Sequence, residues 1–472
     1  MRFRDESLPL NAGDTFLSVA RKLPFNLGDP KSLASQLAKA TLGSAGMRIL
    51  GMAVTFGVGV QLARYLGPEG YGVYGTVMAI AALLIVPAQL GLPQLVTREI
   101  ASSVRRQSWS EARGVVNGYF GAVAAASVAM VVLGLIAHWL WLQTHGGRAQ
   151  STQMVAAYYW GIAIVPVFAL TNLAASVIRG LHRPVLSLFF ETLLRPVLYG
   201  IVLFAAFAAL GGVTAVLALS SHVWVAAGVL ALVCVWMWLA LPEQIRSANA
   251  NYAAAPSWRR AATPMLTTEI VRVADSQYAI LMLGLLVSID HVGLFRVAVA
   301  TGALLGLPGT LVNVVIMPYV VELKHANDTR RLQMAATGAA ALNFAATALM
   351  TLIMYLFGER LLEIAFGRQF VPAWPALMAI GVSYSLRAFF GSAASILNMA
   401  DGERTVALAY GLGLACGIPV TWVLTKYYGI AGAAAGMIVS AIVESVILRQ
   451  DALRKLGIDT TVLSLAVLVF RR

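Results

Sequence analysis

The sequence predicts an all-α integral membrane protein with twelve transmembrane helices in two six-helix lobes, related by a pseudo-two-fold axis along the membrane normal. Three observations predict this class: the composition, the number of long apolar runs, and an internal repeat. Of the 472 residues, 59% are hydrophobic and 12% are charged, and the mean hydropathy is +0.78. Soluble domains carry about twice that charged fraction, so the composition indicates a chain that resides in a bilayer.

Twelve apolar runs are long enough to be membrane-spanning helices, because about 30 Å of hydrocarbon requires about 20 residues at 1.5 Å per residue. The runs are 42–66, 71–96, 115–142, 153–178, 184–210, 213–241, 261–286, 292–319, 332–357, 371–397, 405–425 and 429–448. They define an N-terminal tail (1–41), an N-terminal lobe (42–241), a linker (242–260), a C-terminal lobe (261–448) and a C-terminal tail (449–472).

The basic residues predict the orientation. The net charge of +13 is scattered through short connectors instead of being gathered on one soluble module, which argues against nucleic acid as a partner. Most of the 34 lysines and arginines fall on one side if the N-terminus is inside. Because basic loops remain in the cytosol and the number of spans is even, both termini and the linker are expected to be cytosolic.

Local matches between the two halves indicate an internal repeat. The stretch "YGVYG" (71–75) aligns with "HVGLF" (291–295) through Gly72 and Gly293, which are 221 positions apart, and "AASVIRG" (174–180) aligns with "AASILNM" (393–399) at a shift of 219. A competing match, "GLP" at 91–93 and 306–308, requires a gap. Two lobes of six helices each share one orientation, an arrangement that transporters use to rock around a central site.

Charged residues inside the spans are candidates for function, because an ionisable group in hydrocarbon is costly unless it snorkels, pairs or faces water. Arg272, Asp275 and Arg387 lie near the middle of their spans. The side chains expected to reach the headgroups from near a span end belong to Arg48, Arg296 and Glu444.

Two groups of these charges are close in sequence. Glu191 and Arg195 stand four residues apart before a proline, and we expect them to form a structural ion pair. In "TTEIVRVADSQYAI" (267–280), Glu269, Arg272 and Asp275 are expected to share one helix face. The functional interpretation is that this face lines a water-filled cavity between the lobes, opposite Arg48; the alternative is a buried charge network that holds the lobes together.

The sequence contains no P-loop, HExxH, CxxC or GxSxG pattern, and its six histidines are not spaced as ligands on one helix. No catalytic residue, metal site or cofactor is therefore predicted. Coupling to H⁺ or Na⁺ through Glu269 or Asp275 is left open.

The stretch "ARYLGPEGYGVYG" (63–75), followed by "LGLPQLVTREIA" (90–101), resembles the polysaccharide-transporter branch of the MOP flippase superfamily, the Wzx-like oligosaccharide-lipid flippases. The resemblance implies a V-shaped bundle around a central cavity in a bacterial inner membrane. It implies a cargo of undecaprenyl-pyrophosphate-linked oligosaccharide, moved from the inner to the outer leaflet for O-antigen, capsule or exopolysaccharide. Polysaccharide polymerase and chain-length proteins are further partners that it suggests.

The resemblance also implies roles for residues. Arginines in such a cavity would bind the pyrophosphate, because guanidinium forms bidentate charge-assisted hydrogen bonds with phosphates; the candidates here are Arg48, Arg272, Arg296 and Arg387. Tyr384 is one of several tyrosines placed to stack on sugars. The competing interpretations are a cation-coupled multidrug exporter of the same superfamily, a membrane glycan-assembly enzyme, and a scaffold in which the charges are structural.

Overall fold

The computed structural model describes residues 30–144, 152–253, 255–326, 328–400 and 402–464, and within these ranges it contains helices and no strand. The N-terminal half comprises α2 (Pro30–Gln89), α3 (Leu92–Arg106), α4 (Trp109–Thr144), α5 (Thr152–Gly180), α6 (Pro184–Leu188), the π-helix η1 (Phe189–Leu194), α7 (Arg195–Leu210), α8 (Ala215–Ala240) and α9 (Glu243–Ser247). The C-terminal half comprises α10 (Ala255–Leu286), α11 (Ile289–Gly302), the 3₁₀ helix η2 (Ala303–Gly306), α12 (Leu307–His325), α13 (Thr329–Phe366), the 3₁₀ helix η3 (Arg368–Ala373), α14 (Trp374–Phe390), α15 (Ala393–Asn398) and α16 (Glu403–Leu456).

The described helices supply twelve crossings, which confirms the predicted fold class. Eight helices are long and apolar enough to span a bilayer, and two of these, in 43–106 and 403–456, contain a turn and cross twice. The turns fall at Gly67 and Gly429, whose positive φ values of 65° and 57° break each long helix. The remaining crossings are α10, whose charged residues lower its hydropathy, and α14, which has only 17 residues.

Two predicted boundaries in the N-terminal lobe differ from the structure. The first helix begins at Pro30, so residues 30–41 of the expected N-terminal tail are helical, while residues 1–29 lie outside the described part of the chain. The second span was expected to continue to residue 96, but α2 ends at Gln89 and α3 begins at Leu92. Leu90 and Gly91 both have positive φ and turn the chain there.

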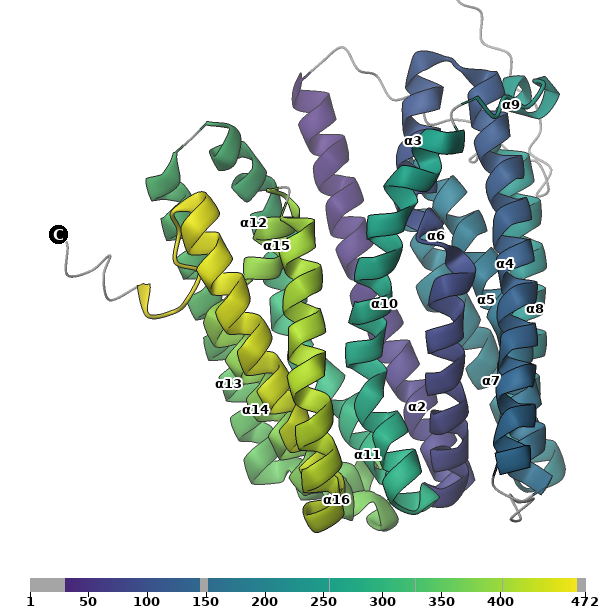
Figure 1. The fold of residues 1–472 in the computed structure, drawn as a ribbon, viewed down its shortest axis with the longest axis vertical. Helices are drawn as coiled ribbons and strands as arrows, with labels where there is room; N and C mark the ends of the chain where they lie inside the picture. The colour runs from purple at the N-terminus through teal and green to yellow at the C-terminus, as the bar shows by residue number, and fades with distance from the viewer. Residues whose placement is uncertain (1–29, 145–151, 254, 327, 401, 465–472) are drawn as a thin grey trace, which may run out of the picture.

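The helices form two groups that meet along α2 and α11. Figure 1 shows α12 to α16 on one side and α3 to α9 on the other, with α2, α10 and α11 between them. A Cβ atom on Gly72 would overlap the carbonyl oxygen of Ile289, and one on Gly293 would overlap that of Pro68. Two glycines thus let the backbones of α2 and α11 touch.

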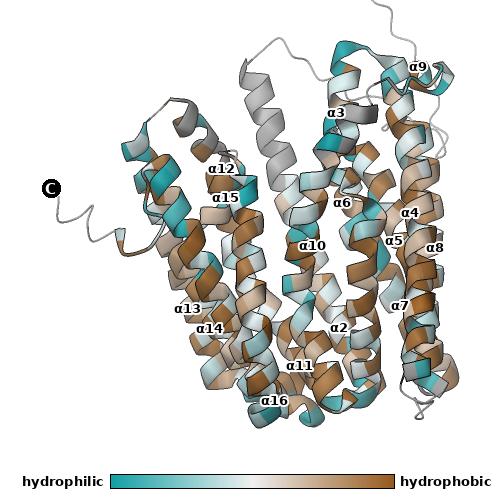
Figure 2. Cartoon of the chain, viewed as in Figure 1, coloured by the Kyte–Doolittle hydropathy of each residue, from teal (hydrophilic) through white to brown (hydrophobic). Residues whose placement is uncertain are grey.

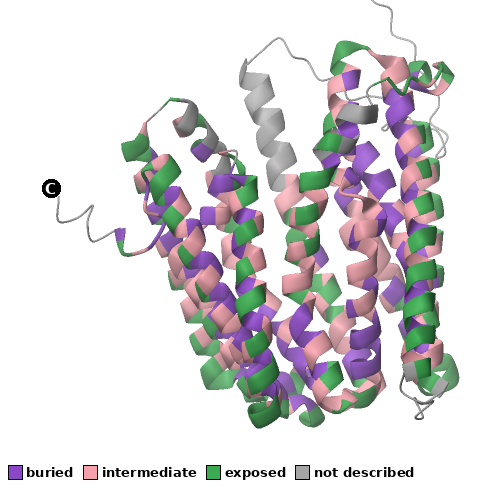
Figure 3. Ribbon diagram, viewed as in Figure 1, coloured by how far each residue is buried: buried purple, intermediate pink, exposed green. Residues whose placement is uncertain are grey.

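The outer helices present apolar side chains outward. Along α4, the residues are mainly hydrophobic in Figure 2 and many are exposed in Figure 3. Trp139 of α4 is 58% exposed and Trp224 of α8 is 69% exposed. Exposed apolar area on this scale requires a lipid environment, so the protein is a multi-pass membrane protein.

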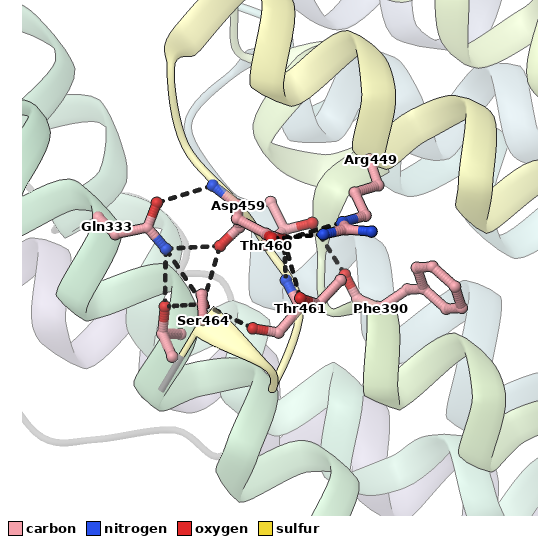
Figure 4. Close-up of polar contacts among 8 residues, drawn as sticks. Gln333, Phe390, Arg449, Asp459, Thr460, Thr461 and Ser464 are labelled. Atoms are coloured by element: carbon pink, nitrogen blue, oxygen red, sulfur yellow. Dashed lines mark hydrogen bonds and ion pairs between the residues drawn. The ribbon is translucent and has the colours of Figure 1, made fainter. Parts of the chain in front are cut away.

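The C-terminal segment differs from the predicted tail. Residues 449–456 are the last turns of α16, and residues 457–464 pack back between α13 and α14 (Figure 4). Asp459 accepts two hydrogen bonds from the Arg449 guanidinium, at 3.1 and 2.6 Å. Its backbone N–H donates to Oε1 of Gln333, and its carbonyl oxygen accepts from Nε2 of the same side chain. Thr460 donates to the carbonyl oxygen of Phe390 at 2.9 Å. We call residues 457–464 the C-terminal clip.

Candidate functional site

A cavity of about 660 Å³ lies between the N-terminal lobe and the α11–η2–α12 arm of the C-terminal lobe. Its N-lobe wall comes from α2, η1, α7 and α8, and its C-lobe wall comes from α11, η2 and the start of α12. Three arginines line it: Arg48, Arg195 and Arg296. We call this space the cationic cavity. Two of the three, Arg48 and Arg296, are among the predicted substrate-binding residues.

Each arginine reaches the cavity from a different element. Arg48 is an exposed residue of α2. Arg296 projects from α11 past Gly75, where a Cβ atom would stand 3.3 Å from its Cδ, so the missing side chain leaves room for its stem. Arg195 begins α7, with its guanidinium carbon 4.1 Å from the centre of the Phe168 ring, a cation–π contact that orients it.

The prediction that Glu191 and Arg195 form an ion pair is wrong. Glu191 instead pairs with Arg179 of α5, through contacts of 3.1 and 3.2 Å to the two carboxylate oxygens. The reason is the π-helix η1 (Phe189–Leu194), whose wider turn removes the regular four-residue spacing on which the prediction depends. Glu191 is thereby neutralised at the cavity wall, and Arg195 has no carboxylate partner among the described ion pairs.

Aromatic side chains line the cavity beside the arginines. Tyr74 and His222 are joined by a hydrogen bond of 3.0 Å between the phenol oxygen and Nδ1. Tyr199 stacks on His222 at 4.2 Å between ring centres and donates to the carbonyl oxygen of Ala218. Together with Tyr71 these residues line the cavity. Sequence reasoning missed them, although a histidine inside a span was a usable signal.

The charged residues of 267–280 do not share one environment. Arg272 donates to both carboxylate oxygens of Glu269, with 2.9 Å between Nε and Oε2, and its side chain is 55% exposed. Neither residue is among those that line the cationic cavity. Residues at i and i+6 are about 120° apart around a helix, so Asp275 turns away from Glu269 and enters the C-terminal lobe.

Asp275 belongs to a polar network inside the C-terminal lobe. Arg387 of α14 contacts Asp275 at 3.4 Å and Glu444 of α16 at 2.8 Å. The Ser440 hydroxyl lies 2.8 Å from Asp275 and 2.9 Å from Glu444. Glu444 was expected to snorkel to the headgroups, but its side chain is only 2% exposed because Arg387 binds it within the bundle.

A second cavity of about 260 Å³ lies beside this network, between α12, α13, α14 and α16. Arg387 and Glu444 line it together with Asn313, Asn343 and Tyr384. We call it the polar pocket. Arg387, predicted to bind substrate together with Arg48 and Arg296, therefore lines a different cavity from these two. Among the described residues, no group of three or more His, Cys, Asp or Glu side chains is arranged to hold a metal ion.

Comparisons with known proteins agree with this architecture. The family model described as "polysaccharide biosynthesis protein" matches residues 37–324. A multidrug resistance MATE family transporter of the MOP superfamily, in an inward-facing conformation, superimposes with a TM-score of 0.73 at 11% identity, covering 88% of this chain and 98% of that one.

Two further solved structures have the same fold. The lipid II flippase MurJ, in an inward closed conformation, gives a TM-score of 0.67 at 12% identity, covering 89% of each chain. A MOP superfamily transporter from Pyrococcus furiosus, described as having a binding pocket of reverse polarity, gives 0.62 at 12% identity, covering 91% of this chain and 96% of that one. Comparison of the sequence with curated proteins finds no match. The chain therefore belongs to the polysaccharide biosynthesis protein family and has the twelve-helix fold of MOP superfamily transporters.

Proposed function

We propose that this protein is a flippase that moves undecaprenyl-pyrophosphate-linked oligosaccharide from the inner to the outer leaflet of a bacterial inner membrane. The observation that carries the proposal is the cationic cavity. Arg48, Arg195 and Arg296 converge there from both lobes, and none of them belongs to an ion pair within the described residues. The nearby carboxylate of Glu191 forms its salt bridge with Arg179, which leaves the three guanidinium groups to suit a pyrophosphate, whose oxygens accept bidentate hydrogen bonds.

Alternating access is the mechanism that this arrangement supports. The lobes touch at Gly72 and Gly293, and Arg64 of α2 donates from Nε to the carbonyl oxygen of Ala365 in α13 at 2.6 Å. Rocking around these contacts would close the cavity on one side while opening it on the other. With both termini in the cytosol, the pyrophosphate would enter from the cytosolic leaflet while the polyprenyl chain stays in lipid. The covalent structure of the lipid does not change.

The C-terminal network is the place where we propose that H⁺ or Na⁺ couples to transport. Asp275 and Glu444 share one guanidinium, so the three ionisable side chains carry net negative charge when both acids are ionised. A proton or a cation would restore neutrality where both carboxylates are largely buried. Glu269, which pairs with Arg272 along α10, has no comparable surplus of charge.

The competing functions fit the molecule less well. A cation exporter would need carboxylates in its substrate cavity, whereas Glu191 of the cationic cavity is bound by Arg179. The predicted absence of enzyme activity agrees with a family and fold shared with transporters. A scaffold would give no reason for arginines from opposite lobes to line one cavity.

Reconstitution into proteoliposomes tests the proposed function. Fluorescent undecaprenyl-pyrophosphate oligosaccharide is placed in one leaflet, and its arrival in the other is measured by quenching, with and without imposed H⁺ and Na⁺ gradients. The proposal requires protein-dependent transfer of this lipid and no accumulation of a cationic dye. Dye transport without lipid transfer would establish the exporter function instead.

A further inference from the structure

We propose that the polar pocket is a second substrate subsite, which holds one sugar ring of the glycan headgroup while the cationic cavity holds the pyrophosphate. This inference rests on the proposed function and adds a sugar-binding site in the C-terminal lobe, separate from the cationic cavity. The pocket has a volume of about 260 Å³. Its polar lining includes Thr310, Asn313, Asn343, Tyr384, Arg387 and Tyr410.

One lining residue, Asn313, has a side-chain oxygen without the partner that burial normally requires. The side-chain oxygen Oδ1 of Asn313 is buried and accepts no hydrogen bond in the structure. Buried polar atoms in folded proteins almost always have a partner, because leaving one unpaired is costly. Because Asn313 itself lines the pocket, a small rotation of its amide would turn this oxygen toward a sugar hydroxyl, which would supply the missing donor.

Two glycines in the pocket wall leave space for an amide and an aromatic ring, one turn apart. A Cβ atom on Gly309 would stand 3.2 Å from both Nδ2 and Oδ1 of Asn343, and one on Gly306 would stand 3.0 Å from the Tyr384 ring. The glycines of η2 and α12 therefore allow both side chains to approach the backbone closely. Amides that hydrogen-bond to hydroxyls, beside a ring for the apolar face of the sugar, form a carbohydrate site.

The polar pocket adjoins the cationic cavity. Thr310 lines both spaces, and the successive residues Leu304 and Leu305 of η2 line one each. A headgroup with its pyrophosphate against Arg296 can therefore extend past η2 into the polar pocket. The two spaces have different chemistry, because the guanidinium of Arg387 is already bound by two carboxylates. Arg387 is thus assigned to hydroxyl recognition and not to the pyrophosphate.

The variant Asn313→Leu tests the sugar subsite with the intact protein. It replaces an amide, whose oxygen has no protein partner, with an apolar group of similar size, so folding should be retained, and thermal melting checks this. The matched control is Thr425→Val, which likewise removes a buried polar atom without a partner, here a hydroxyl; Thr425 is not among the residues lining either cavity. The probes are undecaprenyl pyrophosphate without sugar and a set of undecaprenyl pyrophosphates carrying one hexose or N-acetylhexosamine.

The expected result is selective. Asn313→Leu should slow transfer of a sugar-bearing lipid by about three- to tenfold, as loss of one neutral hydrogen bond predicts, and leave the sugar-free lipid unchanged. Thr425→Val should change neither, and Arg296→Ala should slow both. If Asn313→Leu slows both lipids equally, or neither, the subsite does not exist.

Failure of the proposed function has a different signature. If the wild-type protein transfers no undecaprenyl pyrophosphate of any kind, the flippase proposal fails, and the pocket is then judged by binding alone. Saturation-transfer NMR with a panel of neutral hexoses and N-acetylhexosamines would support the pocket if a contact seen with the wild type is lost in Asn313→Leu. No contact with any sugar of the panel would overturn the inference.

Discussion

Gly72 of α2 and Gly293 of α11 face each other where the two lobes meet, and each leaves room for the backbone of the opposite helix. The contact is reciprocal: Gly72 faces the carbonyl oxygen of Ile289 and Gly293 faces that of Pro68. Both pairs of equivalent residues are 221 positions apart, the shift of the sequence repeat. Self-complementary contact between equivalent positions is what two-fold symmetry produces, so the pseudo-two-fold axis passes near this contact.

Closing the space between these glycines should weaken the lobe contact. Gly72→Ala should destabilise the protein by about 1–3 kcal/mol, the usual cost of overpacking, with a corresponding fall in melting temperature in detergent. Gly57→Ala is the matched control on the same helix, because a Cβ atom there has no neighbour within 4 Å. If both variants melt like the wild type, the lobes do not depend on this close approach.

The polar network in the C-terminal lobe should be strongly destabilised by loss of the Arg387 guanidinium. Arg387→Met leaves Asp275 and Glu444 without their common partner, and removal of one member of a buried pair costs about 3–5 kcal/mol. The double variant Arg387→Met/Glu444→Gln should be more stable than the single variant, because one stranded charge is gone. Chemical denaturation of the three proteins measures the difference; equal stability of the single and double variants would contradict the assigned pairing.

The C-terminal clip should loosen in acid. Partial burial raises the pKa of Asp459, but hydrogen bonds from Arg449 and Thr461 more than offset this and hold its pKa below the usual value. A carboxyl with a lowered folded-state pKa stabilises the protein above its unfolded pKa of about 3.9, and the contribution is lost as pH falls through the folded pKa.

Asp459→Asn is the corresponding variant. Its melting temperature should lie below that of the wild type at pH 7, and the gap should shrink as the pH falls below about 4. Hydrogen exchange at residues 457–464 should report the same trend. A gap that stays constant, or widens, toward low pH would show that the ionised Asp459 is not what fixes the clip.

The sequence predicted the fold well because membrane helices are long and apolar. The run 184–210 coincides with the combined extent of α6, η1 and α7, and the run 261–286 lies within α10. The ion pairs inside the bundle could not be predicted from length and hydropathy. The π-helix η1 changes the neighbours of Glu191, and no residue pattern in "FFETLL" indicates it.

The site was predicted in part, for reasons of helix geometry. Arg48 and Arg296 could be identified as charges in apolar spans, but their convergence depends on how the lobes dock. Arg195 was assigned to a structural pair because its distance from Glu191 suits a regular helix. Arg272 and Asp275 were grouped by sequence spacing, although the turn between them directs one toward Glu269 and the other into the C-terminal lobe.

Paired arginine variants in the flipping assay test the central claim, that the cationic cavity binds the pyrophosphate. Arg296→Gln removes a cavity guanidinium, and Arg272→Gln removes a guanidinium that does not line the cavity. Hydrogen bonds to charged groups are worth about 1.5–3 kcal/mol, so Arg296→Gln should lose about tenfold or more of its transfer of undecaprenyl-pyrophosphate-linked sugar, while Arg272→Gln remains close to wild type. Equal loss in both variants, or full activity of a well-folded Arg296→Gln protein, would contradict the account.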